Sequence, residues 1–353
     1  MTTPTIPTVA EHRTLTIGAQ AHAPDGSGYY RLFLPFRHFG ENSHHMAGMV
    51  PPGHQWTPTP EDVDGLDVLV FQRPAGKMGT RLLERLSGYT KTVYETDDDM
   101  LRADRSGLPH LDDGKMRETI RRCYRLADMV TVSTDYLAEQ IRPYNDMVRV
   151  LPNFINAELF AQADDWRAKL PEGRPLMIGW QGGTSHLVDM MTVGEGLRRV
   201  LDANPDVRMH FAGFDYSPVL RSEKLRARCS WTNWQQNVWD HYKLTCHFDV
   251  AIAPLADIPF NRSKSHLKAL EAAAMGIPIV AADLLPYRGF VVDGVTGFLV
   301  STEDEFEKRL TELVNEPEMR AEMGAAARKV AAGWTIQEGW RLWQAAYEEV
   351  ADA

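Results

Sequence analysis

Residues 260–283 read FNRSKSHLKALEAAAMGIPIVAAD, and this pattern predicts a loop, a helix, a glycine stop and a buried strand. The loop is polar, and Ser265 can cap the helix that follows it. Gly276 and Pro278 are expected to end that helix at about Met275. The apolar run 277–282 then has the length of a strand, so the segment predicts one α/β unit of a parallel sheet.

The predicted helix carries a charged stripe near its start. Lys264, Lys268 and Glu271 follow one another at spacings of four and three residues, which places them on one face. Two ammonium groups and a carboxylate near a helix N-terminus can hold an anionic ligand. An exposed Lys–Glu surface pair explains the same pattern equally well.

Length and composition favour a globular protein of two domains. The chain has 353 residues and a net charge of −10, which argues against indiscriminate binding of polyanions. Its three cysteines are far apart and form neither a zinc pattern nor a disulfide framework, so a reducing cytoplasm is expected. The first residues lack the features of a secretory signal, and no apolar run approaches the ~20 residues of a membrane helix, so no stable membrane insertion is expected.

Strands and helices alternate along the chain, which indicates βαβ units. Strands are expected at 15–17, 68–71, 92–94, 129–132, 148–151, 176–180, 207–211, 250–253, 277–281 and 297–300. Helices are expected at 81–87, 116–126, 186–201, 238–245, 264–275 and 336–350. We therefore predict Rossmann-like domains at 1–170 and 171–335, joined by a linker at 168–175, and a final helix at 336–353 that packs back toward the first domain.

Ligands of open α/β sheets bind at the carboxyl ends of the strands, which selects particular loops. In the first domain, Gly26, Ser27 and Gly28 lie between a strand and a helix, where glycines allow a phosphate to approach the backbone. A plain turn is the alternative. In the second domain the corresponding loop is formed by Gln181, Gly182, Gly183, Thr184, Ser185 and His186. We favour a ligand site there over an ordinary capped turn.

Asp97, Asp98 and Asp99 form a triple carboxylate directly after a predicted strand. Three interpretations compete: a divalent metal site, a contact to an acceptor or a general base, and an acidic turn that caps the next helix. Adjacent residues seldom supply a complete set of metal ligands, so metal ranks last. Arg73, at the end of the preceding strand, is a candidate anion contact or a salt-bridge partner of these aspartates.

Common catalytic and metal motifs are absent from the sequence. The chain contains no HExxH, CxxC, GxSxG or GxxxxGK[ST] pattern, and no metal site is predicted.

Taken together, several segments resemble the GT-B glycosyltransferases, in particular the "group 1" class that uses nucleotide sugars and retains anomeric configuration. The similarity is strongest in the second half, in MIGWQGGTSH, FDVAIAPL, NRSKSHLKALEAAAMGIPIVAAD and DGVTGFLV. In the first half, ADMVTVSTDYLAEQI and VRVLPNFINAELF resemble the last strands of the family's first domain. The resemblance implies two Rossmann-like domains whose parallel sheets face a central cleft.

The resemblance also assigns roles within the donor segment. Glu271 matches the second of two family glutamates and would hold the ribose of the donor. The first glutamate, which contacts the transferred sugar, is replaced here by Ser263. Backbone amides of Ser265, His266 and Leu267 would bind the diphosphate, and Lys264 or Lys268 would neutralise it.

The implied activity is transfer of a sugar from a UDP- or GDP-linked donor to an unidentified acceptor, without an essential metal or cofactor. Asp98 and Lys268 are the expected catalytic residues, and Arg73, Asp97 and Asp99 the expected acceptor contacts. The acceptor could be a glycan, a lipid, a small molecule or a modified DNA base, so nucleic acid enters only as a substrate. An epimerase, phosphorylase or hydrolase on the same fold, or a non-catalytic nucleotide-sugar-binding protein, are the alternatives.

A basic stretch in the first half is a candidate surface for an anionic acceptor. We favour the alternative, a solvated helix face whose charge is balanced by Asp112, Asp113, Glu118 and Asp128. The members of the basic stretch are Arg102, Arg105, Lys115, Arg117, Arg121, Arg122 and Arg125.

Overall fold

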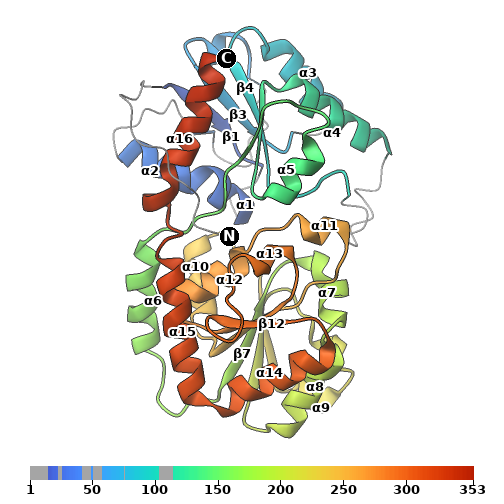
Figure 1. Cartoon of the computed structure of the whole chain (residues 1–353), viewed down its shortest axis with the longest axis vertical. Helices are drawn as coiled ribbons and strands as arrows, with labels where there is room; N and C mark the ends of the chain where they lie inside the picture. Colours follow the sequence, from blue (N-terminus) through green and yellow to red (C-terminus); the bar gives the residue numbers. More distant parts are fainter. Residues whose placement is uncertain (1–14, 23–25, 42–48, 51–57, 75, 103–113) are drawn as a thin grey trace. The chain divides into compact units, whose positions relative to one another are not determined.

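The computed structural model describes residues 15–22, 26–41, 49–50, 58–74, 76–102 and 114–353 (Figure 1). Contacts between residues divide the chain into two compact units. The C-terminal unit comprises Ile155–Arg262 and His266–Thr335. The N-terminal unit comprises the described residues up to Phe154 together with Ser263–Ser265 and Ile336–Ala353. Each unit is an α/β structure built on a parallel sheet, as the alternation predicted.

The N-terminal unit contains a six-stranded sheet in the order β2-β1-β3-β4-β5-β6. All its strand pairs are parallel. The strands are β1 (Ile17–Gln20), β2 (Met49–Val50), β3 (Val68–Gln72), β4 (Lys91–Thr96), β5 (Met129–Val132) and β6 (Val148–Val150). Every residue of β3 and β5 is buried, which matches the continuous apolar runs that revealed them.

Helices and short helical turns connect these strands. They are α1 (Gly26–Gly28), η1 (Tyr29–Phe33), α2 (Leu34–Glu41), η2 (Glu61–Val63), α3 (Gly76–Leu86), α4 (Gly114–Leu126), α5 (Asp135–Ile141) and α16 (Ile336–Asp352). The last helix buries Trp343 and Tyr347 completely, and the Tyr347 ring packs against Phe36. This aromatic stripe is the reason that the C-terminal helix belongs to the N-terminal unit.

The C-terminal unit contains a second six-stranded sheet, in the order β12-β11-β10-β7-β8-β9. Its pairs are also parallel. The strands are β7 (Met177–Gln181), β8 (Arg208–Gly213), β9 (Cys229–Asn233), β10 (Val250–Ala253), β11 (Ile279–Ala282) and β12 (Gly297–Val300). In this order β7 and β10 are neighbours, so the two halves of the sheet diverge between them. That is the place where open α/β sheets bind ligands.

The helices of the C-terminal unit connect and cover these strands. They are α6 (Glu158–Ala168), η5 (Thr184–His186), α7 (Leu187–Met191), α8 (Gly194–Ala203), η6 (Ser217–Leu220), α9 (Glu223–Arg226), α10 (Val238–Thr245), α11 (Pro259–Arg262), α12 (Leu267–Ala274), α13 (Leu285–Arg288), α14 (Glu303–Asn315) and α15 (Pro317–Ala331). Ile178 and Trp180 join the hydrophobic core with Leu197 of α8 and Phe306 of α14. Because strand side chains alternate, Gly179 and Gln181 point to the opposite face.

The boundary between the units lies earlier than the predicted 170/171. Phe154 ends the first part of the N-terminal unit, and α6 belongs to the C-terminal unit. Arg167 of α6 donates to the carbonyls of Cys246 and Phe248, at 2.8 and 2.9 Å. The predicted linker at 168–175 is therefore the connection from α6 to β7 within one unit.

Several predicted elements differ in the structure. The strand at 15–17 lies at β1 (Ile17–Gln20), and β2 and β9 have no predicted counterpart. Strand β9 is an edge strand with no buried residue, so it leaves no apolar signal in the sequence. The predicted helix 186–201 is broken into η5, α7 and α8, with Thr192 and Val193 between the last two.

The helix of the opening segment begins three residues later than predicted. Helix α12 starts at Leu267, its cap residue is His266, and no side chain caps it. The prediction that Ser265 caps the helix is therefore wrong, and Lys264 precedes the helix. Its end agrees better, because the C-cap is Met275 and Gly276 follows with a φ of +68°.

Candidate functional site

The first candidate site lies in the C-terminal unit, where β7 meets α10 and α12. Gln181 ends β7, and its Nε2 donates to Oε2 of Glu271 at 2.5 Å. Gln181 Oε1 lies 2.5 Å from Nε2 of His241 on α10. Glu271 is only 5% exposed, so it is not the exposed surface carboxylate of the alternative interpretation. The structure thus joins two residues predicted from sequence to one, His241, that was not.

Burial fixes the chemistry of this chain of hydrogen bonds. Loss of hydration, together with the charge of Lys268, lowers the pKa of His241 to about 4, so the imidazole is neutral at pH 7. Gln181 donates a hydrogen bond through its amide nitrogen to a carboxylate, so its oxygen accepts a hydrogen bond from the His241 Nε2–H group. The direction of each hydrogen bond is therefore determined, and the donor to the Glu271 carboxylate is a neutral amide group.

A second chain of contacts starts in η5 and α7, which directly follow the loop after β7. His186 Nδ1 lies 2.6 Å from Oδ2 of Asp189, which is 2% exposed. His186 Nε2 lies 3.3 Å from Nζ of Lys268. The Lys268 ammonium also lies over the Trp180 ring, 5.1 Å from its centroid. Asp189 and Trp180 were not predicted as site residues, whereas His186 ends the loop 181–186 for which a ligand site was predicted.

The two glycines of this loop have different surroundings. A Cβ on Gly182 would lie 2.6 Å from the Trp180 ring and 2.9 Å from the His186 ring, so this glycine is required by packing. A Cβ on Gly183 would meet nothing within 4 Å. The space beside Gly183 is therefore open, and a ligand could approach the backbone of the loop there. Thr184 opens η5, whose cap residue makes no side-chain hydrogen bond.

The predicted diphosphate-binding residues separate into two groups in the structure. His266 and Leu267 start α12 in the C-terminal unit, and the His266 ring stacks on Phe290 at 4.6 Å. Burial lowers the pKa of His266 to about 3, so its ring is neutral and packs as an aromatic side chain. Ser263, Lys264 and Ser265 belong by their contacts to the N-terminal unit.

The segment 263–265 is held by two hydrogen bonds within the N-terminal unit. Thr134 Oγ1 donates to the Ser263 carbonyl at 2.9 Å, and Asn153 Nδ2 donates to Ser265 Oγ at 2.9 Å. The Ser265 hydroxyl therefore accepts from Asn153 instead of capping a helix. Ser263 is fully buried, so its position offers no obvious room for the family's usual glutamate side chain.

The second candidate site lies in the N-terminal unit, around the turn after β4. Arg73 follows β3 with a φ of +49°, which is unusual for a residue that is not glycine. Its Nη1 donates to Asp98 Oδ2 at 3.1 Å, and its Nη2 donates to the Ser27 hydroxyl. Its Nε lies 3.9 Å from Asp97 Oδ1. The structure thus brings together four residues that the sequence analysis selected.

The carboxylates of this turn are crowded. Burial raises the pKa of Asp98, and the charge of Asp97 adds to the rise. The cations Arg73 and Lys264 act in the opposite direction. A carboxylate with a raised pKa is better suited to accept a proton from a hydroxyl group than an ordinary one.

Asp99 is separated from this cluster by its own partners. Its Oδ2 accepts from Arg102 Nη1 at 2.6 Å, and its Oδ1 accepts from the amide of Leu101 at 3.2 Å. Gly26 and Gly28 form α1, so the glycine loop is helical here, with only Ser27 bonded to Arg73. Asp99 acts on the Arg73–Asp98 pair through its charge, which adds to the rise of the Asp98 pKa.

A buried ion pair lies next to the turn that follows β4, because one of its members, Glu95, belongs to that strand. Arg31 and Glu95 are both fully buried, with Nε to Oε1 at 2.7 Å and Nη2 to Oε2 at 3.0 Å. Arg31 also donates to Asn153 Oδ1 at 2.9 Å and lies 4.8 Å above the Trp343 ring. Asn153 in turn holds Ser265, so the ion pair is connected to the segment 263–265.

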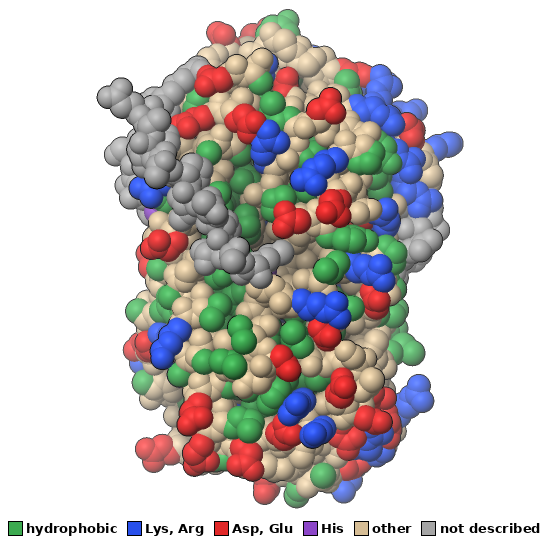
Figure 2. Space-filling view, in the orientation of Figure 1, with side chains coloured by type: hydrophobic (Ala, Val, Ile, Leu, Met, Phe, Trp, Pro, Cys, Tyr) green, Lys and Arg blue, Asp and Glu red, His purple; other side chains and the backbone are tan. Residues whose placement is uncertain are grey.

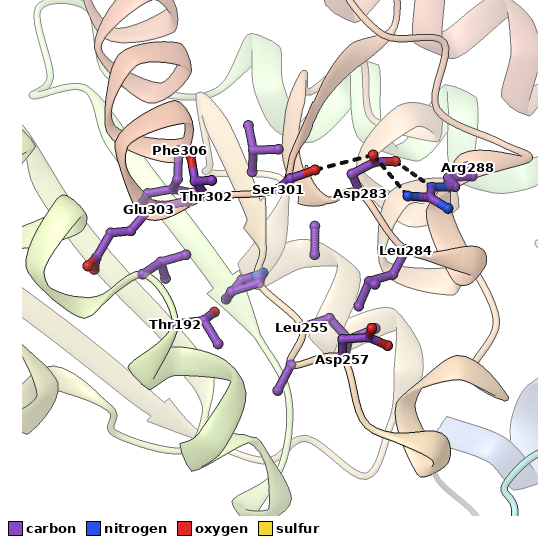
Figure 3. Close-up of a pocket in the computed structure, with 15 residues that line it drawn as sticks. Thr192, Leu255, Asp257, Asp283, Leu284, Arg288, Ser301, Thr302, Glu303 and Phe306 are labelled. Atoms are coloured by element: carbon purple, nitrogen blue, oxygen red, sulfur yellow. Dashed lines mark hydrogen bonds and ion pairs between the residues drawn. The ribbon is translucent and has the colours of Figure 1, made fainter.

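A separate pocket of about 370 Å³ lies in the C-terminal unit (Figure 3). Its lining follows β10, β11 and β12 and includes Leu255, Asp257, Asp283, Arg288 and Glu303. Asp283 and Arg288 pair with each other at 2.6 Å. None of the residues predicted individually as catalytic, donor-binding or acceptor-binding lines this pocket. Its carboxylates serve the local fold, because Glu303 also accepts from the amides of α8.

The basic stretch forms a surface of the N-terminal unit, visible at the upper right of Figure 2 over α3 and α4. Arg122 pairs with Glu84, and both Arg121 and Arg125 pair with Glu118. Arg105 lies outside the described residues. Within the described ranges no cluster of three or more His, Cys, Asp or Glu residues is arranged to hold a metal ion, and no helix could cross a bilayer.

Comparisons with known proteins show which proteins the chain resembles. Residues 189–316 match the family model described as "Glycosyl transferases group 1". A D-inositol 3-phosphate glycosyltransferase of Nocardiopsis dassonvillei is 24% identical over 60% of this chain, and the match spans 54% of that relative. The chain thus spans about half the length of this curated relative.

Solved structures extend the similarity to both units. Sucrose-phosphate synthase from Thermosynechococcus elongatus has a TM-score of 0.68 at 14% identity, covering 95% of this chain and 98% of that one. Anabaena HepE, solved in complex with UDP, has a TM-score of 0.64 at 15% identity, covering 96% and 99%. At this identity the likeness establishes the fold. The protein therefore has the GT-B fold of glycosyltransferases, and its residues 189–316 are the region that matches group 1 of these enzymes.

Proposed function

We propose that the protein is a glycosyltransferase that takes its sugar from a nucleoside diphosphate donor bound by the C-terminal unit. The observation that carries this proposal is Glu271, a buried carboxylate oriented by Gln181 and His241. A carboxylate fixed at the carboxyl ends of the strands suits a pair of neighbouring hydroxyl groups, such as those of a ribose. The group 1 match includes this residue.

The diphosphate would be bound at the start of α12. This helix begins without a side-chain cap, so the positive end of its dipole is available to an anion. Lys268 adds an ammonium one turn from Glu271. We propose UDP as the first donor nucleotide to test, because HepE was solved with UDP and UDP-glucose, and GDP as the second.

The chemical step would be departure of the nucleoside diphosphate from the sugar. Negative charge grows on the leaving phosphate in the transition state, and Lys268 and the helix dipole stabilise it there. We propose that transfer proceeds with retention, so the acceptor hydroxyl forms its bond to the sugar on the same face from which the bond to the diphosphate breaks. We also propose that transfer needs no metal ion, since a fixed cation supplies the same charge. The sugar contact that the family's first glutamate would make is absent at Ser263, so donor sugar choice rests on other groups.

The acceptor would bind the N-terminal unit at the Arg73–Asp97–Asp98 turn. Asp98 is the proposed general base, because its raised pKa matches the task of accepting a hydroxyl proton. Arg73 would orient an anionic or polar acceptor. A cytoplasmic location is part of the proposal, supported by the three cysteines Cys123, Cys229 and Cys246, none of which is in a disulfide.

Calorimetry with UDP, GDP and ADP, followed by turnover of the corresponding nucleotide sugars with a panel of acceptors, tests the proposal. We expect one nucleotide to bind best, and transfer that is equal with and without EDTA. Release of free sugar at the same rate with and without every acceptor would contradict transferase activity. Absence of binding to all three nucleotides would contradict the donor site.

A further inference from the structure

Asp189, His186 and Lys268 form a continuous chain of polar contacts in the C-terminal unit. Asp189 Oδ2 lies 2.6 Å from His186 Nδ1, and His186 Nε2 lies 3.3 Å from Lys268 Nζ. Asp189 and His186 come from the segment after β7, whereas Lys268 comes from α12. Seventy-nine residues of sequence separate Asp189 from Lys268 (268 − 189), so no local pattern could have linked them.

The carboxylate that starts this chain is held firmly. Asp189 is 2% exposed, and its Oδ1 accepts from the Ala256 amide at 2.8 Å and from Asn261 Nδ2 at 2.7 Å. Both donors follow β10. Oδ2 is left to face the imidazole, so the loop after β10 determines where the carboxylate meets His186.

The contacts determine the tautomer of His186. An ionised carboxylate only accepts hydrogen bonds, so Nδ1 carries the proton that points to Asp189. If Nε2 were also protonated, the N–H of the imidazolium would point at the N–H groups of the Lys268 ammonium, and neither group could accept a hydrogen bond. The neutral ring with a lone pair on Nε2 avoids this conflict and accepts a hydrogen bond from Lys268. The backbone amide of His186 donates to the Tyr216 hydroxyl at 2.9 Å, which fixes the position of the residue itself.

The surroundings of Lys268 limit where its charge can go. Its ammonium lies against His186 Nε2 on one side and over the Trp180 ring on another. The Trp180 and His186 rings meet edge to face at 5.5 Å. A lysine side chain is otherwise long and flexible, so such support reduces the entropy lost when it binds an anion.

We propose that Asp189 and His186 are positioning residues that hold the Lys268 ammonium for the diphosphate of the donor. The inference rests on the proposed donor site and adds to it the residues that orient its cation. Asp189 selects the tautomer, His186 presents a lone pair, and Lys268 keeps its charge while it is held. His186 itself does not contact the sugar or the nucleotide in this assignment.

Two substitutions separate this role from simple packing. Asp189→Asn keeps the shape and can keep an oxygen for the Ala256 amide, but it can turn an N–H toward His186 Nδ1 and so move the imidazole proton to Nε2. His186→Phe keeps an aromatic ring beside Trp180 and removes the acceptor. His186→Gln restores an acceptor at about the distance of Nε2, and His247→Gln, an exposed histidine in the same unit, is the matched control.

Nucleotide binding by calorimetry gives the first readout. UDP, or GDP if it is preferred, is compared with its nucleoside, which lacks phosphate. We expect Asp189→Asn and His186→Phe to weaken diphosphate binding by about tenfold or more, with nucleoside binding unchanged and His186→Gln intermediate. Equal losses for diphosphate and nucleoside, or no loss for either, would overturn the positioning role.

Nitrogen-15 NMR of the ligand-free protein gives a readout that does not depend on the proposed function. We expect the His186 ring of the native protein to show a protonated Nδ1 and an unprotonated Nε2 at pH 7, and the pattern to invert in Asp189→Asn. A native ring protonated on Nε2 would overturn the inference even if the donor binds. If no nucleotide binds but the ring is protonated on Nδ1, the donor proposal fails while the hydrogen-bonded chain stands.

Discussion

The two candidate sites hold their carboxylates in opposite ways. In the C-terminal unit, Glu271 accepts from a neutral amide, which is itself oriented by a neutral imidazole. In the N-terminal unit, Asp98 lies beside a second carboxylate, Asp97, and a guanidinium, Arg73. Gln181 and His241 orient Glu271 through neutral groups. Burial and the charge of Asp97 raise the pKa of Asp98. The first arrangement suits binding, and the second suits proton transfer.

The cores beneath the two sites differ as well. The N-terminal unit carries a fully buried ion pair between Arg31 and Glu95, and the aromatic rings of α16 cover it. In the C-terminal unit the candidate site adjoins a hydrophobic core cluster that includes Trp180, the residue before Gln181. This comparison leads to five predictions, which begin with the largest effect.

Arg31→Met should have the largest effect on stability. The substitution leaves the Glu95 carboxylate buried without its cation, which costs about 3–5 kcal/mol. Chemical denaturation, followed by fluorescence, measures the unfolding free energy. Arg121→Met, which removes a partly exposed pair with Glu118, should cost less than about 1 kcal/mol. A loss no larger than that of the control would show that the buried pair does not support this unit.

Asp98→Asn should lower turnover by about 100-fold or more and leave donor affinity unchanged, because a general base acts only on the acceptor. Initial rates and nucleotide calorimetry test the two parts. In the native protein, turnover should fall as the pH drops through the raised pKa of Asp98. Equal losses of turnover and donor affinity would remove the distinction between the two sites.

The same substitution should change stability in a pH-dependent way. A carboxyl group whose pKa is raised in the folded state stabilises the fold only when protonated, so its contribution is lost as the pH rises through that pKa. Asp98→Asn should therefore raise the melting temperature at pH 7, and the gain should disappear near pH 4. An unchanged melting temperature at pH 7 would argue against a raised pKa of Asp98 in the folded protein.

Glu271→Ala should weaken nucleotide binding by about 10- to 100-fold, since hydrogen bonds to a buried charge contribute about 1.5–3 kcal/mol. Calorimetry with the preferred nucleoside diphosphate measures this. The exposed Glu172→Ala in the same unit is the control and should bind normally. Retained affinity in Glu271→Ala would contradict the ribose role.

His241→Leu should have the smallest effect, a loss of about tenfold or less in nucleotide affinity, because it acts through Gln181. It also tests the neutral state of the ring. Since the pKa of His241 is lowered from 6.5 to about 4, the unfolded chain binds an extra proton between these values. The unfolding free energy should fall as the pH drops from 6.5 to 4, and less steeply in His241→Leu. An identical slope would contradict a buried neutral imidazole.

Prediction from the sequence succeeded where a local pattern carries the information. The continuous apolar runs of β3, β5 and β10 and the glycine at 276 are readable one segment at a time, and the structure has these elements. Strand β9 was missed because it has no buried residue. The start of α12 was misplaced because the Ser265 hydroxyl bonds to Asn153, a residue distant in sequence.

The sequence by itself determined the alternating α/β architecture, because strand and helix periodicities are local properties. It also placed Gln181 at the end of a strand, and Lys268 and Glu271 on a helix that precedes a buried strand. It also selected Arg73 and the aspartates, because they follow strands. Only the tertiary structure decided which of them meet. His241, His186 and Asp189 become site residues through contacts across 60, 82 and 67 positions of sequence, and no helical or strand period reaches that far. Hydrogen-bond direction and pKa depend on burial and on such partners, which arise only when the chain has folded.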